Sequence, residues 1–256
     1  MTDLLNEFGL LVVISAFAVT GFGGFVKGAV GFALPMIMIS GIGSLMSAEV
    51  AIAALIIPAL VTNLWQASRE GVGAAVLTIR KYWRLNVVLL ITIAVCAQLV
   101  AILPEDVLFI ILGGMVTVFG VIQLAGWRPG FPARLTNVVE YLTGLVAGFF
   151  GGLSGVWGPP ILLYLLARDT PKKELVRAQG VSFLGGSVVL VGAHTQSGVL
   201  NDNTFWLSVC LVVPALAGMV AGRFLQDRLD QNRFRRLTLI VLVIAGVNLL
   251  RRGLIG

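Results

Sequence analysis

The feature that most constrains this sequence is its series of long apolar runs. Several reach about 20 residues, the length that an α-helix needs to cross a hydrocarbon layer of roughly 30 Å. The chain is 58% hydrophobic and only 12% charged, whereas soluble domains carry about 25% charged residues. We therefore predict an all-α integral membrane protein. The expected spans are 49–67, 85–103, 106–126, 175–198, 204–222 and 236–254, and two longer runs cover 8–46 and 137–167.

Positive charge gathers in four of the links between these runs. By the positive-inside rule we expect these links to be cytoplasmic at the cell membrane, and the basic-free links near 40–48, 103–106 and 199–203 to be outside. The acidic N-terminus, with Asp3 and Glu7, is then outside, and it lacks the basic start of a cleaved signal peptide. The net charge of +6 is thus a membrane signal, and we expect no nucleic-acid partner. The four groups are Arg69, Arg80, Lys81 and Arg84; Arg128 and Arg134; Arg168, Lys172, Lys173 and Arg177; and Arg223, Arg228, Arg233, Arg235 and Arg236.

The two longer runs are predicted to be helical hairpins. Residues 127–136 and 168–177 fall on the same side, so the run 137–167 must enter the membrane and return. The run 8–46 does the same from the opposite face. We expect the turns at glycine-rich interruptions, Gly21–Gly31 in the first and around Gly151–Pro160 in the second. Each half of the chain, 1–126 and 127–256, is then a broken hairpin plus three spans, and the halves have opposite orientation.

A sequence repeat supports this division. When the chain is shifted by 127 residues, Gly21–Gly31 aligns without a gap on Gly148–Gly158. Identical residues stand at Gly21/Gly148, Phe22/Phe149, Gly24/Gly151, Gly28/Gly155 and Gly31/Gly158. The alternative is that these glycines serve close helix packing, as we expect for Gly218 and Gly222. Paired interruptions in inverted halves are the best sequence indication of a transporter's binding site.

The two interruptions should therefore border a ligand. Non-helical backbone is tolerated at membrane depth only where it is buried in protein or lines a wet cavity. A helix that restarts there presents free N–H groups and a positive dipole end, which favour an anion. The glycines expected at this site are Gly28, Gly31, Gly155 and Gly158, with Pro35, Pro159 and Pro160 opening the helices that follow.

Polar side chains near the interruptions complete the candidate site. Lys27 is expected to contact the anion, because an ionisable residue at membrane depth is functional by default; alternatively it snorkels to an interface. Ser154 donates either to the ligand or to a helix carbonyl, and Trp157 either walls the site or lies in an interfacial belt. Asn63, Gln179 and Ser182 are further substrate-binding candidates. His194 is a candidate proton carrier or a structural histidine.

Motifs for enzymes and metals are missing from the sequence. Val26 stands where a dinucleotide fingerprint needs its third glycine, and Val156 stands where a nucleophile elbow needs its closing glycine. His194 is the only histidine, which excludes a two-His metal site. We expect no metal, no cofactor and no enzymatic activity, and we interpret Cys96 and Cys210 as packing residues.

At the two interruptions the chain resembles the TauE/SafE family of sulfite exporters. The resemblance rests on the stretches Gly21–Pro35 and Gly148–Pro160, and on the region from Arg177 through Gly218 and Gly222 to the Arg-rich loop. It implies export of sulfite or of an organosulfonate such as sulfoacetate by an ion-coupled carrier.

We therefore predict a secondary transporter that works by alternating access. The nearest alternative is an anion uniporter or channel for a small carboxylate or other oxyanion. An intramembrane enzyme and a structural or assembly protein are alternatives of a different class. The expected partners are a small anionic solute and the lipid bilayer, and a homodimer is left open.

Overall fold

The computed structural model describes residues 9–68, 71–127, 130–225 and 230–255, which are helical with short connections and contain no strand. Arg69, Arg128 and Arg228 of the predicted basic groups lie outside the described residues, as do Asp3 and Glu7. The helices in chain order are α2 (Leu10–Val30), α3 (Leu34–Ile42), α4 (Ala48–Ser68), α5 (Val72–Lys81), α6 (Trp83–Cys96) continuing as η1 (Ala97–Ala101), α7 (Glu105–Leu124), η2 (Ala133–Leu135), α8 (Thr136–Ser154), α9 (Gly158–Ala167), α10 (Lys172–Gln196), α11 (Asp202–Cys210), α12 (Val212–Leu225) and α13 (Gln231–Ile255).

Within the described part of the chain, seven helices are long and apolar enough to cross a membrane. They are Leu10–Val30, Ala48–Ser68, Trp83–Ala101, Glu105–Leu124, Lys173–Gln196, Asp202–Leu225 and Arg233–Ile255. The helix α9 is apolar but shorter. The predicted class, an all-α multi-pass membrane protein, is confirmed.

Two helix breaks occur, one at the end of the first predicted interruption and one within the second, and both are much narrower than expected. The first is confined to Gly31–Ala33, where Gly31 has a φ of 89° and closes α2 by donating its N–H to the Lys27 carbonyl at 2.8 Å. The second is confined to Gly155–Trp157, where Gly155 has a φ of 67°. The prediction that the chain is interrupted over the whole of Gly21–Gly31 is wrong in extent, because α2 is continuous through Val30.

Most of the glycines in these stretches serve helix packing instead. A Cβ at Gly28 would lie 2.1 Å from the Met219 carbonyl oxygen of α12, and one at Gly218 would lie 2.0 Å from the Gly21 carbonyl oxygen. On the other side of the molecule, a Cβ at Gly148 would lie 2.5 Å from the Thr92 Cβ of α6. Backbones at such distances leave no room for a side chain, as at small-residue crossings in membranes generally.

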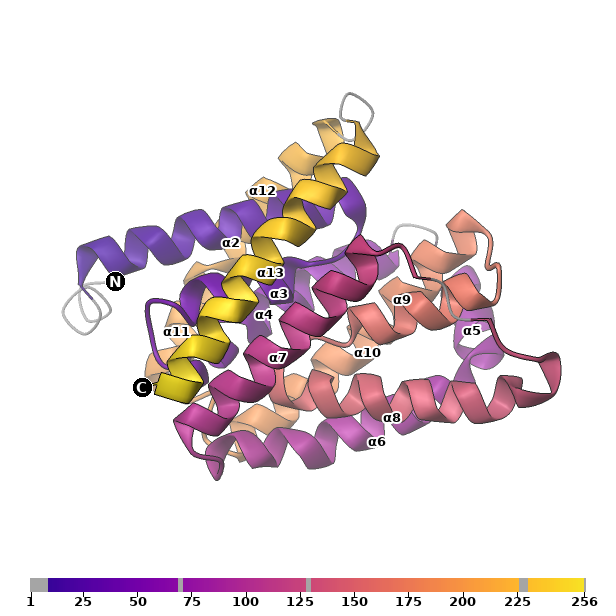
Figure 1. Cartoon of the computed structure of the whole chain (residues 1–256), viewed down its shortest axis with the longest axis horizontal. Coiled ribbons are helices and arrows are strands. Elements are labelled where there is room, and N and C mark those ends of the chain that lie inside the picture. Colours follow the sequence, from indigo (N-terminus) through magenta and orange to yellow (C-terminus); the bar gives the residue numbers. More distant parts are fainter. Residues whose placement is uncertain (1–8, 69–70, 128–129, 226–229, 256) are drawn as a thin grey trace.

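Four helix pairs have the most extensive contacts between elements. The pairs are α2 with α12, α6 with α8, α4 with α10, and α7 with α13. Figure 1 shows α13 running alongside α7, and α6 running alongside α8. Among the seven spanning helices, α4 of the α4–α10 pair is the most buried, because 61% of its most apolar 18-residue stretch is buried. The functional side chains described next lie on or beside this pair.

Candidate functional site

Lys27 is a buried cation whose partners are neutral. It lies one turn before the break at Gly31, and only 2% of its surface is exposed. Its ammonium donates a hydrogen bond to Thr62 Oγ1 at 2.9 Å and another to Asn63 Oδ1, both on α4. In the described ranges no carboxylate lies within ion-pairing distance of it. A buried charge in this situation is costly unless something else supplies the opposite charge.

Asn63 connects the lysine to α10. Its Nδ2 donates to Ser187 Oγ at 2.7 Å and to the Phe183 carbonyl oxygen at 3.2 Å. The Ser187 hydroxyl in turn donates to the same Phe183 carbonyl at 2.8 Å. With both amide protons used on α10, the Asn63 oxygen is held toward Lys27. One side chain therefore links α2, α4 and α10.

The two helix breaks and Lys27 line one small cavity. Its volume is about 20 Å³, which is room for about one water molecule. Trp157, of which 1% is exposed, forms part of the wall and packs against Phe183 with ring centroids 6.3 Å apart. The lining residues are Lys27, Phe32, Ala33, Pro35, Met36, Asn63, Gly155, Val156, Trp157, Gly158, Pro159 and Phe183.

The first turns of α3 and α9 both border this cavity. The positive end of each helix dipole therefore lies beside the lysine, and both favour negative charge there. Free backbone donors are fewer than we expected, because Pro159 and Pro160 in α9 and Pro35 in α3 have no N–H. The positive potential thus comes from the ammonium and the helix dipoles more than from a cradle of amides.

The cavity brings together five of the predicted site residues: Lys27, Asn63, Gly155, Trp157 and Gly158. The other five substrate-binding candidates and His194 are not among its lining residues. Gly28 faces α12, and the Gly31 carbonyl accepts from Gln66 Nε2 at 3.4 Å. Ser154 donates to the Phe150 carbonyl at 2.6 Å and accepts from the Val156 N–H at 3.2 Å, so it stabilises the break from behind.

The remaining three candidates lie elsewhere on α10. Ser182 donates to Asn86 Oδ1 on α6 at 2.7 Å. Gln179 is buried, and its amide nitrogen has no hydrogen-bond partner in the described structure. His194 is fully buried, with its Nδ1 3.5 Å from the Ser197 hydroxyl.

Sequence reasoning missed Thr62, Ser187 and three apolar lining residues, Phe32, Ala33 and Met36. Thr62 could have been found, because it directly precedes the predicted Asn63. Ser187 lies one turn beyond Phe183 on a helix rich in small residues, and nothing in the sequence distinguishes it from its neighbours. Phe32 and Ala33 became lining residues only because the first break is shorter and later than predicted.

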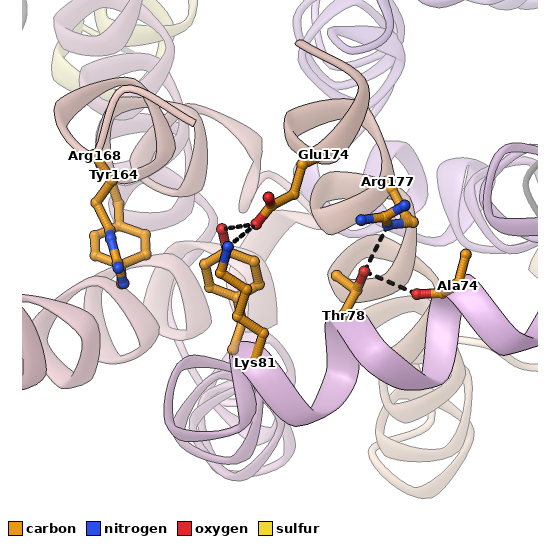
Figure 2. Close-up of polar contacts among 8 residues, drawn as sticks. Ala74, Thr78, Lys81, Tyr164, Arg168, Glu174 and Arg177 are labelled. Atoms are coloured by element: carbon orange, nitrogen blue, oxygen red, sulfur yellow. Dashed lines mark hydrogen bonds and ion pairs between the residues drawn. The ribbon is translucent and has the colours of Figure 1, made fainter. Parts of the chain in front are cut away.

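A second polar cluster ties α5 to the start of α10 (Figure 2). Glu174 forms an ion pair with Lys81 at 2.5 Å and accepts a hydrogen bond from the Tyr82 hydroxyl at 2.6 Å. Arg177 donates from Nε to Thr78 Oγ1 at 2.7 Å. Burial and the hydrogen bond to Glu174 raise the pKa of Tyr82 above its ordinary value. These contacts hold the basic end of α10, the helix that orients Asn63.

Apolar spanning helices, paired breaks and a buried lysine with neutral hydrogen-bond partners define a multi-pass membrane protein with a buried polar candidate site. The family model for "Sulfite exporter TauE/SafE" matches residues 16–249, nearly the whole chain. The protein belongs to this family, whose members are membrane transporters of sulfur anions. Comparisons with curated proteins and with solved structures gave no match.

Proposed function

We propose that this protein is a secondary transporter that exports a small sulfur-containing anion, sulfite or an organosulfonate such as sulfoacetate, by alternating access. The observation that carries the proposal is Lys27, a buried ammonium between two helix breaks with neutral hydrogen-bond partners. A substrate anion would supply the missing negative charge. Thr62 and Asn63 hold the ammonium in place, while the dipoles of α3 and α9 add to its attraction.

The size of the cavity favours a carrier over an open pore. A space of about 20 Å³ does not admit sulfite, which has four heavy atoms. The anion would enter only when α3 or α9 moves away from Lys27, and that movement would open the site to one side of the membrane. We interpret the present arrangement as a closed state between the two open ones.

The contact pattern supports the division into repeats 1–126 and 127–256. In chain order, α2, α4, α6 and α7 of the first half correspond to α8, α10, α12 and α13 of the second. Exchanging the halves therefore turns the pair α2–α12 into the pair α8–α6, and it leaves the pairs α4–α10 and α7–α13 unchanged. A molecule with this pattern can rock one half against the other around a central site. We propose inverted repeats with the basic links in the cytoplasm and the N-terminus outside.

Transport by purified protein in liposomes tests the proposal. Sulfite, sulfoacetate, thiosulfate and acetate are each offered with an imposed proton gradient, and uptake against the anion gradient is measured. We expect uphill movement of a sulfur anion that is lost in Lys27→Met and kept in Lys173→Met, a substitution of an exposed lysine. Downhill movement alone would indicate a uniporter or channel. Selective transport of acetate would contradict the sulfur assignment.

A further inference from the structure

An apolar groove of about 400 Å³ lies between α7, α8 and α9, far larger than the cavity at Lys27. Four of its lining residues, Pro160, Leu163, Tyr164 and Ala167, recur at the spacing of a single helical face of α9. The rest of the lining comes from α7, α8 and the link between them. Figure 1 shows α9 between α7 and α8.

The corresponding helix of the first half has a protein partner where α9 has the groove. α3 packs against α13, with Arg252 donating to the carbonyls of Gly43 and, at 3.2 Å, Met46. No comparable packing of α9 against α7 occurs in the described structure. The face of α9 that lines the groove therefore has open space where α3 has a helix.

The chemistry of the groove fits a hydrocarbon chain. Its rim includes Leu142 on α8 and Trp127 in the link after α7, and each is 56% exposed. The Thr143 hydroxyl is satisfied within α8 by donating to the Val139 carbonyl at 2.7 Å. The Tyr164 hydroxyl accepts from Arg168 at 3.0 Å. The groove thus offers apolar surface, and lipid is what surrounds it.

A cation marks one end of the groove. Its deep end is at Pro160, beside the second helix break, and its other end is at Ala167 and Trp127, where α9 and α7 finish. Arg168 follows Ala167 directly and lies beside the Tyr164 ring, apart from the Lys81–Glu174 pair (Figure 2). Among the described residues it has no ion-pair partner, so most of its five N–H donors are available for a phosphate.

We propose that this groove is a binding site for one acyl chain of an anionic phospholipid, with the headgroup phosphate on Arg168 and Trp127 at headgroup level. The bound chain packs on α9 where α13 packs on α3. The bound chain therefore packs against α9, the helix whose first turn borders the Lys27 cavity. Lipid binding at this site does not depend on which anion is transported.

Native mass spectrometry of the purified protein tests the site. The protein is incubated in detergent with equal amounts of phosphatidylglycerol and phosphatidylcholine, and retained lipid is counted. We expect one retained phospholipid, with phosphatidylglycerol preferred. Leu163→Trp, which fills the groove, should weaken retention about tenfold. Val241→Trp, on a 54% exposed position of α13, is the matched control and should leave it unchanged. Arg168→Gln should keep the lipid and lose the preference.

Leu142→Trp at the rim is a second filling variant in case Leu163→Trp does not fold. Equal retention by the filling variants and the Val241→Trp control overturns the proposal, as does an unchanged preference in Arg168→Gln. A protein partner is tested with Leu142→Cys in a chain with Cys96 and Cys210 replaced by alanine. Disulfide-linked dimers with no retained lipid would assign the groove to a second copy of the chain.

Discussion

The Lys27 ammonium donates a hydrogen bond to the side-chain oxygen of Asn63, and Asn63 is itself held by Ser187 and Phe183 of α10. The hydrogen bonds of Lys27 therefore depend on the relative position of α2, α4 and α10. An anion that binds the ammonium must compete with a neutral amide oxygen, and not with a carboxylate. Because the amide oxygen of Asn63 competes only weakly, the Lys27 charge stays available to the substrate. The substitution Asn63→Asp, which keeps the shape of the side chain, changes this relationship.

Asn63→Asp should abolish transport and raise the melting temperature. The introduced carboxylate gives Lys27 a permanent opposite charge, which stabilises the buried ammonium and removes its attraction for substrate. Uptake into liposomes should fall at least about tenfold. The matched control is Gln123→Glu, which makes the same amide-to-carboxylate change beside Arg235, away from the cavity. Unimpaired transport by Asn63→Asp would remove Lys27 from the substrate site.

Gly28→Ala should destabilise the protein by about 1–3 kcal/mol, because the added methyl group overpacks the contact between α2 and α12. The new Cβ would lie 2.1 Å from the Met219 carbonyl oxygen, so the helices must separate. Gly73→Ala is the control, since a Cβ there meets no atom within 4 Å and should stabilise α5 by about 0.5–1 kcal/mol. Thermal unfolding in detergent measures both. Equal stability of the two variants would contradict the close crossing.

Ala33→Gly should stabilise the first break slightly. Ala33 has a φ of 82°, in the left-handed region that favours glycine. Relief of about 1–2 kcal/mol of backbone strain exceeds the extra entropy that glycine loses on folding, about 0.5–1 kcal/mol. The same substitution at Ala29, within α2, lacks that relief and should destabilise. A lower melting temperature for Ala33→Gly than for the parent protein would argue against the break geometry.

Tyr82→Phe should change stability at alkaline pH. The raised pKa means that the folded state holds the phenol proton more tightly than the unfolded state. This contribution is complete below the ordinary tyrosine pKa of about 10 and is lost as the pH rises above it. The parent protein should lose stability faster than Tyr82→Phe over that alkaline range. Tyr141→Phe, at a 43% exposed position, is the control and should follow the parent curve.

Labelling of introduced cysteines tests the proposed orientation. In a chain with Cys96 and Cys210 replaced by alanine, Lys173→Cys and Arg134→Cys should be protected from an impermeant maleimide in intact cells. Asp106→Cys and Asp202→Cys should react. Permeabilised cells should label at all four positions. Any basic-link position that reacts in intact cells is inconsistent with opposite orientation of the halves.

The membrane-spanning helices could be predicted because run length and the scarcity of charge suffice to recognise them. The extent of the breaks could not, because glycine permits both a turn and a close helix crossing. Gly31 and Gly155 turn the chain, whereas Gly28 and Gly148 let another backbone approach. Only the position of α12 and α6 decides between these uses. Lys27 and Asn63 were predicted from polarity at membrane depth, but their hydrogen bond depends on the α2–α4 distance.

The pairing of α2 with α12 also bears on how the protein is made. α2 enters the bilayer early in synthesis, whereas α12 follows only after all the other helices except α13. Until then the glycine face of α2 has no partner, and lipid must cover it. A chain truncated before α12 would therefore leave the close crossing at Gly24 and Gly28 unformed.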